Sequence, residues 1–331
     1  MWKIMRISNL ISIDTRPEHR KNAEQGIALL MVLWILTILM VIVFSFSYMS
    51  RTETYATMSF KGGIEKKFFA EAGLERGIME LFYRQFYRSQ TVDIEGREIW
   101  KTDDTPYQGQ VGDGLYTVRI TDETAKVDIN TVSEVVLKNL FLNLGVHAEE
   151  VDTIVDSIMD WKDPDDLHRL HGAESDYYMS LPNPYKAKDA NFETLEELLL
   201  VKGMTPEILY GTNEKKGAID FLTLRSGRGT ININSAPKEV LMSIPGITPE
   251  LADAIIERRK DAEIINIGEI ALPQEALDYL SAGENSNAFT INSLGHRSNE
   301  AGGYAIRATV AISGQDNYQI VYYKSPVTIK Q

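Results

Sequence analysis

The sequence feature that most constrains this chain is an apolar run near its N-terminus. Residues 27–44 contain a single polar side chain, Thr37, and no charge. A helix needs roughly 20 apolar residues to cross the hydrocarbon core of a bilayer, so the sequence predicts a membrane-spanning helix over residues 27–47. A polar stretch that ends on Gly26 precedes the run, and no small-residue cleavage box follows it. Any cleavage would therefore fall before the run and leave the apolar segment on the mature protein.

The junction between Gly26 and Ile27 resembles the signal of type IV pilin-like precursors. In that family a prepilin peptidase cuts after the glycine, and the apolar segment becomes the start of a long helix. The resemblance implies that residues 1–26 are a leader and that Ile27 is the mature N-terminus. Pilins usually carry glutamate at the fifth mature position, where this chain has Met31. From the junction alone, an uncleaved N-terminal membrane anchor stays an alternative.

The charge and cysteine content limit the kinds of function that this chain can have. The leader carries five basic and three acidic side chains, a charge of +2, so with a net charge of −13 the rest of the chain stands at −15. Basic residues before the run indicate a cytoplasmic N-terminus, with the bulk of the chain outside the inner membrane. An acidic exported portion argues against non-specific nucleic-acid binding, which requires neutralised phosphates. The lack of cysteine excludes disulfides, metal thiolates and cysteine nucleophiles.

Helical spacing of apolar residues continues beyond the membrane run. Residues 48–88 contain no proline and repeat apolar side chains at the period of a helix. We therefore predict one long helix from about Ile27 to Tyr87. Its weak point is the pair Gly62 and Gly63, because glycine is a poor helix former.

Alternating and β-branched residues predict strands on both sides of a helical middle region. The predicted strands cover residues 91–100 and 116–120, on either side of a glycine turn, and residues 304–312 and 318–323, which form a hairpin. The predicted division of the chain is a leader over 1–26, an N-terminal helix over 27–90, a β region from 91–126 and 288–331, and an inserted α-domain over 127–287. The expected fold is α+β, with a pilin-like long N-terminal helix packed on an antiparallel sheet.

The inserted α-domain contains an internal repeat. Residues 127–137 match residues 231–241, and each copy reads as a short extended entry followed by a helix. Thr131 and Ser235 are the predicted N-caps of these helices. A further segment, residues 192–207, has the same pattern of helix, glycine turn and helix.

The glycine turns of this domain resemble those of helix-hairpin-helix units. In nucleic-acid binders of that class a Gly-x-Gly hairpin brings backbone N–H groups to a phosphate. Here Thr205 and Thr248 replace the second glycine after Gly203 and Gly246, and acidic side chains offset the basic ones. The basic footprint of a DNA-binding surface is therefore missing from the sequence. A structural role is favoured, and the alternative is a membrane-anchored DNA-binding protein of a competence or type IV pilus system.

Ten acidic residues gather between positions 149 and 176, where only Lys162 and Arg169 oppose them. The candidate ligands are four carboxylates within seven residues and a fifth across the loop: Asp160, Asp163, Asp165, Asp166 and Glu174. Calcium prefers several oxygen ligands from a flexible segment, and unpaired carboxylates repel one another, so the sequence predicts a calcium site. The spacing is not that of an EF-hand, and a solvated acidic loop is the alternative.

Two histidines in the same segment raise the question of a second metal site. His168, His171 and Glu174 are three residues apart, a spacing that on a helix could present a zinc face. No His-Glu-x-x-His motif accompanies them, so surface histidines are favoured. The sequence also lacks a Ser-His-Asp signature and a phosphate-binding glycine loop, so it predicts no enzymatic activity.

Taken together, these motifs resemble the minor pseudopilin K family of the type II secretion system over nearly the whole mature chain. Besides the junction, the resemblance rests on residues 70–76, 126–130, 158–163, 172–177 and 231–237. The pilin signal is shared by many pilins. The Asp-Trp-x-Asp motif of residues 160–163 and the Gly-Ala-Glu motif of residues 172–174 are much more specific to this family.

The resemblance implies an inner-membrane protein with a periplasmic globular part. It implies cleavage after Gly26 by prepilin peptidase, N-methylation of Ile27, and a complex with the minor pseudopilins I and J and other pseudopilins at the tip of a short pseudopilus. It also implies calcium binding, with secreted substrates as further candidate partners. Without the glutamate, Met31 cannot neutralise the N-terminal ammonium of an adjacent subunit in an apolar environment. A subunit that cannot provide this neutralising charge suits the first position in a filament. The resemblance therefore implies that Met31 is an assembly residue.

Overall fold

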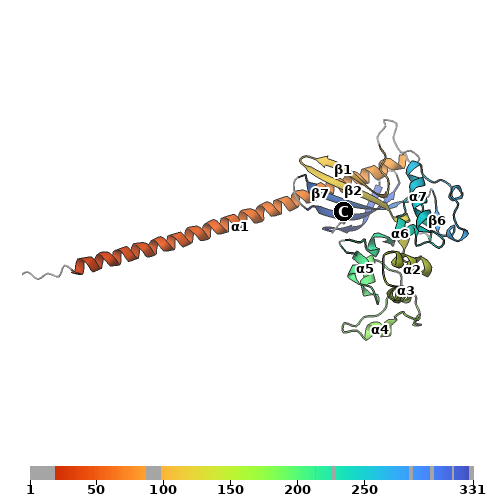
Figure 1. The fold of residues 1–331 in the computed structure, drawn as a ribbon, viewed down its shortest axis with the longest axis horizontal. Coiled ribbons are helices and arrows are strands. Elements are labelled where there is room, and N and C mark those ends of the chain that lie inside the picture. The colour runs from red at the N-terminus through yellow and green to blue at the C-terminus, as the bar shows by residue number, and fades with distance from the viewer. Residues whose placement is uncertain are drawn as a thin grey trace, which may run out of the picture. The chain divides into compact units, whose positions relative to one another are not determined.

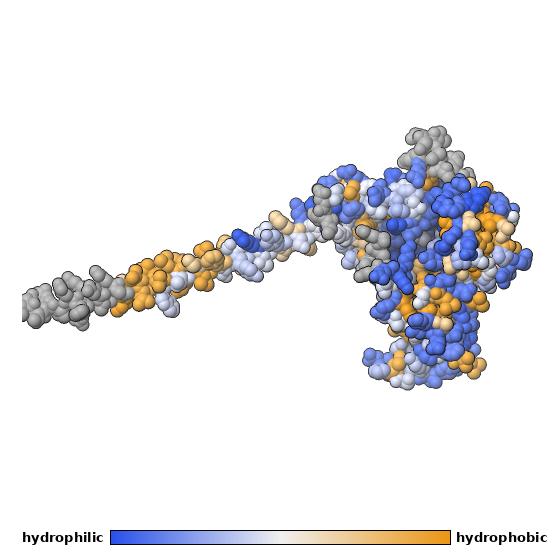
Figure 2. Space-filling view, viewed as in Figure 1, coloured by the Kyte–Doolittle hydropathy of each residue, from blue (hydrophilic) through white to orange (hydrophobic). Residues whose placement is uncertain are grey.

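The computed structural model describes residues 19–86, 98–212, 214–224, 229–282, 286–298, 302–314 and 317–327. The chain divides into two compact units, Met1–Gly62 and Gly63–Gln331. Helix α1 (His19–Phe86) provides the described part of the first unit and the beginning of the second. Residues 27–61 are exposed, and Figure 2 shows that apolar side chains dominate the N-terminal part of this helix. Among the described residues, α1 is the one helix long and apolar enough to cross a membrane, over Ile27–Gln85.

The long helix predicted from about Ile27 is confirmed, and it begins earlier, at His19. Its helical hydrogen bonding continues through the predicted weak point at Gly62 and Gly63. Each glycine weakens a helix by about 1 kcal/mol relative to alanine, and the many good helix formers on both sides outweigh that cost.

Five antiparallel strands form the sheet of the second unit, in the order β1-β2-β7-β8-β9. Figure 1 labels β1, β2 and β7 of this sheet. The strands are β1 (Asp103–Val111), β2 (Gly114–Asp122), β7 (Ala288–Arg297), β8 (Tyr304–Ser313) and β9 (Asn317–Lys324). The last part of α1 packs on one face of this sheet. There Leu74 and Ile78 are buried with Val118, Ile291 and Val310 in one apolar core. This is the α+β fold with a pilin-like helix that the sequence predicted.

Two glycines let α1 approach the sheet closely. Gly73 and Gly77 lie four residues apart, on the same face of the helix. A Cβ atom at Gly77 would stand 3.1 Å from Cγ2 of Ile291, and one at Gly73 would stand 3.0 Å from Cβ of Tyr116. Helix propensity alone would favour alanine at both positions, so the close contact with the sheet explains these glycines.

The strand predicted over residues 91–100 lies mostly outside the described part of the chain, and its described residues, 98–100, form no extended strand. The strand before the glycine turn is β1, which begins with two aspartates and contains Pro106, residues that are depleted in strands. Proline is tolerated there because β1 lies at the edge of the sheet. The predicted C-terminal hairpin is confirmed by β8 and β9.

Between β2 and β7 the chain forms a mainly helical region around a second apolar core. Its α-helices are α2 (Glu134–Asn143), α3 (Ala148–Lys162), α4 (Ser175–Met179), α5 (Pro206–Tyr210), α6 (Lys238–Leu241) and α7 (Pro249–Asp261). Its 3-10 helices are η1 (Glu123–Ala125), η2 (Leu195–Leu200), η3 (Ala218–Asp220), η4 (Ile267–Glu269) and η5 (Gln274–Ala276). Two short parallel pairs complete it: β3 (Val127–Asp128) with β4 (Leu222–Thr223), and β5 (Ile231–Asn232) with β6 (Leu280–Ser281).

The internal repeat is visible in the hydrogen bonds of two asparagines. Nδ2 of Asn130 donates to the carbonyl oxygen of Phe192 at 3.1 Å, and its Oδ1 accepts from the N–H of Phe192 at 2.9 Å. Asn234 makes the same pair of bonds with Ile264, at 2.9 and 2.8 Å. In each copy the asparagine side chain thus bonds both the N–H and the C=O of one distant backbone residue, as a neighbouring strand would.

The predicted N-caps are wrong. Thr131 and Ser235 stand in turns, and helices α2 and α6 begin two residues later, after Ser133 and Pro237. In both copies the side chain at the end of the short strand accepts a backbone N–H two residues on. This turn lengthens the entry to each helix, which the sequence pattern alone does not reveal.

The two glycine turns explain why threonine replaces the second glycine of a Gly-x-Gly hairpin. Gly203 and Gly246 adopt φ of 85° and 80°, a left-handed conformation that favours glycine. Thr205 and Thr248 are the N-caps of α5 and α7, and each hydroxyl oxygen accepts the N–H three residues on at 3.3 Å. The threonines therefore begin the second helix of each hairpin.

Candidate functional site

The acidic segment begins within helix α3. Pro164 disfavours helical backbone in the preceding residue, and Asp163 is extended, with φ −78° and ψ 156°. Helix α3 therefore ends at Lys162. Asp160 lies in the last turn of this helix. The prediction that all four carboxylates of residues 160–166 lie in one loop is therefore wrong, because only Asp163, Asp165 and Asp166 lie beyond the helix.

Three carboxylates converge beside this loop. One oxygen atom from each of Asp163, Asp165 and Glu174 lies within 4.8 Å of the others. Glu174 is 2% exposed, and neither of its carboxylate oxygens accepts a hydrogen bond within the described part of the chain. Burial, followed by the charges of Asp160 and Asp163, raises the pKa of Glu174 to about 7. A buried carboxylate without a donor is costly, so the arrangement fits a cation as the partner.

The other two predicted calcium ligands are placed differently. Asp160 is completely buried, and its Oδ2 accepts the backbone N–H of Arg169 at 3.2 Å. Asp166 is exposed and lies outside the group of three carboxylates. The structure therefore brings together three of the five predicted ligands, and Asp160 holds the returning loop.

Residues outside the cluster also hold this loop. A Cβ atom at Gly172 would overlap the carboxylate of Asp160, so that only glycine fits. The ammonium group of Lys202 donates to the carbonyl oxygens of His171 and Gly172, at 3.2 and 2.9 Å. Gly172 belongs to the Gly-Ala-Glu motif. Lys202 carried no signal in the sequence, because it lies about thirty residues from its partners.

The zinc face, which the sequence favoured less than surface histidines, does not form. Residues 167–174 are not helical, so a spacing of three residues does not bring the side chains together. Nε2 of His168 lies 2.9 Å from Oδ1 of Asp176, and Nδ1 of His171 lies 3.2 Å from Oδ2 of Asp156. Each histidine is thus paired with a carboxylate, as surface histidines commonly are.

A buried charge pair lies where β2 leads through η1 into the inserted domain. Nζ of Lys126 lies 2.5 Å from Oε1 of Glu123, and both residues are buried. The hydroxyl of Thr223 donates to the other carboxylate oxygen. Burial by itself would raise the pKa of Glu123, but the charge and hydrogen bond of Lys126 and the Thr223 hydroxyl bring it below its ordinary value. The pair gives a structural reason for Lys126 in the motif of residues 126–130.

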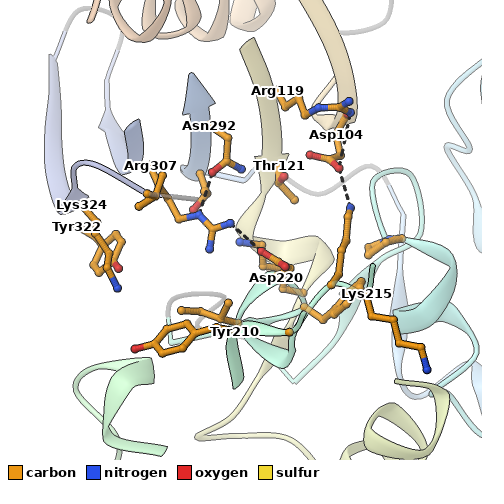
Figure 3. Close-up of a pocket in the computed structure, with 18 of the residues that line it drawn as sticks. Asp104, Arg119, Thr121, Tyr210, Lys215, Asp220, Asn292, Arg307, Tyr322 and Lys324 are labelled. Atoms are coloured by element: carbon orange, nitrogen blue, oxygen red, sulfur yellow. Dashed lines mark hydrogen bonds and ion pairs between the residues drawn. The ribbon is translucent and has the colours of Figure 1, made fainter. Parts of the chain in front are cut away.

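A cleft of about 720 Å³ separates the sheet from the inserted domain (Figure 3). Two pairs of charged side chains bridge it: Lys216 with Asp104 at 2.9 Å, and Arg307 with Asp220 at 2.7 Å. Each pair joins residues that are distant in the sequence, so no sequence pattern predicted it. These bonds fix the inserted domain against the sheet.

The basic residues of the second hairpin are satisfied locally. The guanidinium of Arg259 donates to the carbonyl oxygens of Ile233 and Ala236 at 2.9 and 2.7 Å. The other cations pair with acidic side chains: Lys238 with Asp253, Lys260 with Glu257, and Arg258 with Glu269. The hairpin therefore lacks a surplus of positive charge for a phosphate backbone.

The residues of the predicted processing site lie in α1. Ile27 and Met31 are one turn apart and exposed. Gly26 precedes them in the same helix, so a peptidase would have to act on a segment that is helical here.

Comparison with known proteins identifies relatives of this arrangement. The family model described as "Type II secretion system (T2SS), protein K" matches residues 116–211, and the helix-hairpin-helix motif model matches residues 227–266. The putative type II secretion system protein K of Escherichia coli K12 is 27% identical over 210 residues, which cover 56% of this chain and 60% of that protein. The type II secretion system protein K of Pectobacterium carotovorum is 22% identical over 258 residues, covering 72% and 76%.

A solved structure has the same fold. It is the crystal structure of the GspK-GspI-GspJ complex from the enterotoxigenic Escherichia coli type 2 secretion system. The match has a TM-score of 0.54 and 16% identity, and it covers 83% of this chain and 100% of that chain. At this identity the likeness is one of fold, and it covers most of this chain.

Proposed function

Because the chain belongs to the type II secretion system protein K family, we propose that it is a minor pseudopilin that forms a tip complex with the minor pseudopilins I and J. This complex initiates and caps a periplasmic pseudopilus. The observation that carries the proposal is the family match over residues 116–211, which contains the acidic segment and both of its specific motifs. The inserted domain also supports an end position, because a domain of this size is hard to bury inside a filament.

The chain is anchored and processed as a prepilin. The apolar part of α1 spans the inner membrane, with the leader in the cytoplasm and the globular part in the periplasm. Prepilin peptidase cuts between Gly26 and Ile27 and methylates the new N-terminus. N-terminal mass spectrometry of the membrane protein tests this step. An N-methylated Ile27 is expected, and an intact Met1 would refute it.

The three-carboxylate cluster binds calcium. Asp163, Asp165 and Glu174 would supply carboxylate oxygens, which are the ligands that calcium prefers, and backbone carbonyls and water would complete the coordination. The ion would neutralise the buried charge of Glu174 and fasten the loop between α3 and α4. What supports this step is that the oxygens of Glu174 and Oδ1 of Asp163 have no hydrogen-bond donor among the described residues.

Reconstitution of the complex tests the proposed function. The full-length chain is expressed with pseudopilins I and J of its own secretion system and purified in mild detergent. A stable ternary complex is expected, and deletion of the gene should stop secretion until the wild-type chain is restored. A chain that co-purifies with neither subunit, or a deletion strain that secretes normally, would contradict the proposal. Tight, salt-sensitive DNA binding in a gel-shift assay would favour the DNA-binding alternative.

A further inference from the structure

The two edges of the five-stranded sheet differ in their protection. Strand β1 carries Pro106 and two aspartates, which discourage pairing with another strand. An irregular register occurs in both edge strands, between Asp103 and Pro106 of β1 and between Ile320 and Tyr322 of β9, so it does not distinguish the two edges. On the opposite edge, residues 317–323 of β9 contain no charge, no proline and no glycine. Among the described strands, none pairs with the outer side of β9. An edge of this kind is an exposed template for another strand.

The apolar core beneath α1 continues onto this open edge. Tyr318 and Ile320 of β9 are in register with Ile312 and Val310 of β8, which are buried in that core. The ring of Tyr318 also contacts Phe82 of α1 edge-on, with ring centroids 6.2 Å apart. Tyr318 and Ile320 are nevertheless 37% and 40% exposed, because no strand lies beyond them in the described part of the chain.

The inserted domain holds β9 in place from its other face. The hydroxyl of Tyr322 donates to Oε1 of Glu196 at 2.9 Å, and Nζ of Lys324 lies 3.4 Å from the same oxygen. The ammonium of Lys324 also lies 5.1 Å from the centre of the Tyr210 ring. The edge is therefore a fixed surface, and binding to it costs little ordering of the strand.

From these observations we propose that the open edge of β9 docks an extended strand of a partner pseudopilin, which continues the sheet by β-augmentation. The inference rests on the proposed function, since it assigns a surface to the partners named there. A strand is the occupant because a row of alternating backbone N–H and C=O groups is complementary only to another extended backbone. Seven residues span about 23 Å, enough for a standard strand. Since Tyr318 and Ile320 extend the apolar core to this edge, the docking strand is apolar on the side that covers them.

Hydrogen exchange of the full-length chain tests this assignment. The chain is measured alone and in the purified complex with pseudopilins I and J, in the same detergent. Amides of residues 317–323 should exchange at least about tenfold more slowly in the complex, because local opening then requires loss of the added strand. Amides of β1 provide the internal control and should not change. Unchanged exchange in residues 317–323 of the complex overturns the inference.

A matched pair of variants provides the second measurement. Ile320→Lys places a charge on the open edge, and Val111→Lys places one on β1 at a side chain that is also 40% exposed. Ile320→Lys should weaken the complex at least about tenfold, whereas Val111→Lys should bind as the wild type does. If both variants bind equally well, the inference fails and the proposed function stands. If the wild type itself forms no complex with pseudopilins I and J, the proposed function fails and this inference fails with it. If β9 is instead protected in a homodimer of this chain, the partner assignment is overturned.

Discussion

The acidic cluster predicts opposite effects of one substitution with and without calcium. Glu174→Gln removes one charge from the cluster and keeps the size of the side chain. At pH 8 and without calcium, a carboxyl with a pKa of about 7 is ionised, and its neighbouring carboxylates lie within 4.8 Å. Two like charges at this distance repel by about 3 kcal/mol at an effective dielectric constant of about 20. The buried amide recovers only part of this energy, so the calcium-free variant should be more stable than the wild type by about 1–3 kcal/mol.

With calcium bound, the wild type should instead be more stable than Glu174→Gln. An ion that binds only the folded chain stabilises it by about 2.7 kcal/mol when its free concentration is 100 times its dissociation constant. For a domain of this size the corresponding rise in Tm is about 5–10 °C. Glu174→Gln should lose most of this rise, because one of the three converging carboxylates is missing.

Thermal unfolding of the full-length chain in detergent, followed by intrinsic fluorescence, measures both effects. Trp161 reports from the last turn of α3, beside Asp160. Scans at pH 8 in excess EDTA and in saturating calcium give four values of Tm for the wild type and Glu174→Gln. Asp166→Asn is the matched control, because it removes an exposed carboxylate of the same loop and should keep the full calcium shift. A wild-type Tm that is equal in EDTA and calcium, or a full shift in Glu174→Gln, would refute the reasoning.

Three further predictions concern other parts of the chain. Glu123→Gln should lower the free energy of unfolding at pH 7 by about 3–5 kcal/mol, because it leaves Lys126 buried without its partner. The folded-state pKa of Glu123 is the lower one, so its contribution is present above about pH 4.5 and lost below it; urea unfolding at pH 7 and at lower pH should show an acid sensitivity that the variant lacks. Asn234→Ala should cost about 1–3 kcal/mol in the same assay, because it leaves the N–H and C=O of Ile264 without their partner. Met31→Glu should keep processing, measured by N-terminal mass spectrometry, and alter tip assembly or pseudopilus length; normal complex formation and secretion in that variant would remove the argument from Met31.

The elements that the sequence predicted well are those with a local signal. The long helix follows from unbroken apolar spacing, and the hairpin of β8 and β9 follows from two alternating runs around a polar loop. Strand β1 was missed because its proline and aspartates oppose strand formation, and pairing with β2 at the sheet edge overrides that preference. The N-caps were misplaced by two residues because side-chain turns lengthen the entry to each helix.

The candidate site was likewise predicted only where its signal is local in the sequence. The sequence identified the acidic segment, since the density of carboxylates is a property of composition. It did not separate Asp160, which accepts a backbone N–H, from Asp163, Asp165 and Glu174, which converge. It also offered a zinc face that requires a helix where the chain has none, around His171.

By itself the sequence determined the apolar helix, the repeated hairpins and the acidic segment, because hydropathy, glycine turns and charge density act between near neighbours in the chain. The tertiary structure alone decided that Lys202 fastens the returning loop. Within the described ranges it also decided that Glu174 is buried without a hydrogen-bond donor and that β9 is the open edge of the sheet. Each of these depends on contacts between segments that are distant in sequence. Burial and pairing arise only when folding brings such segments together, so no local pattern records them.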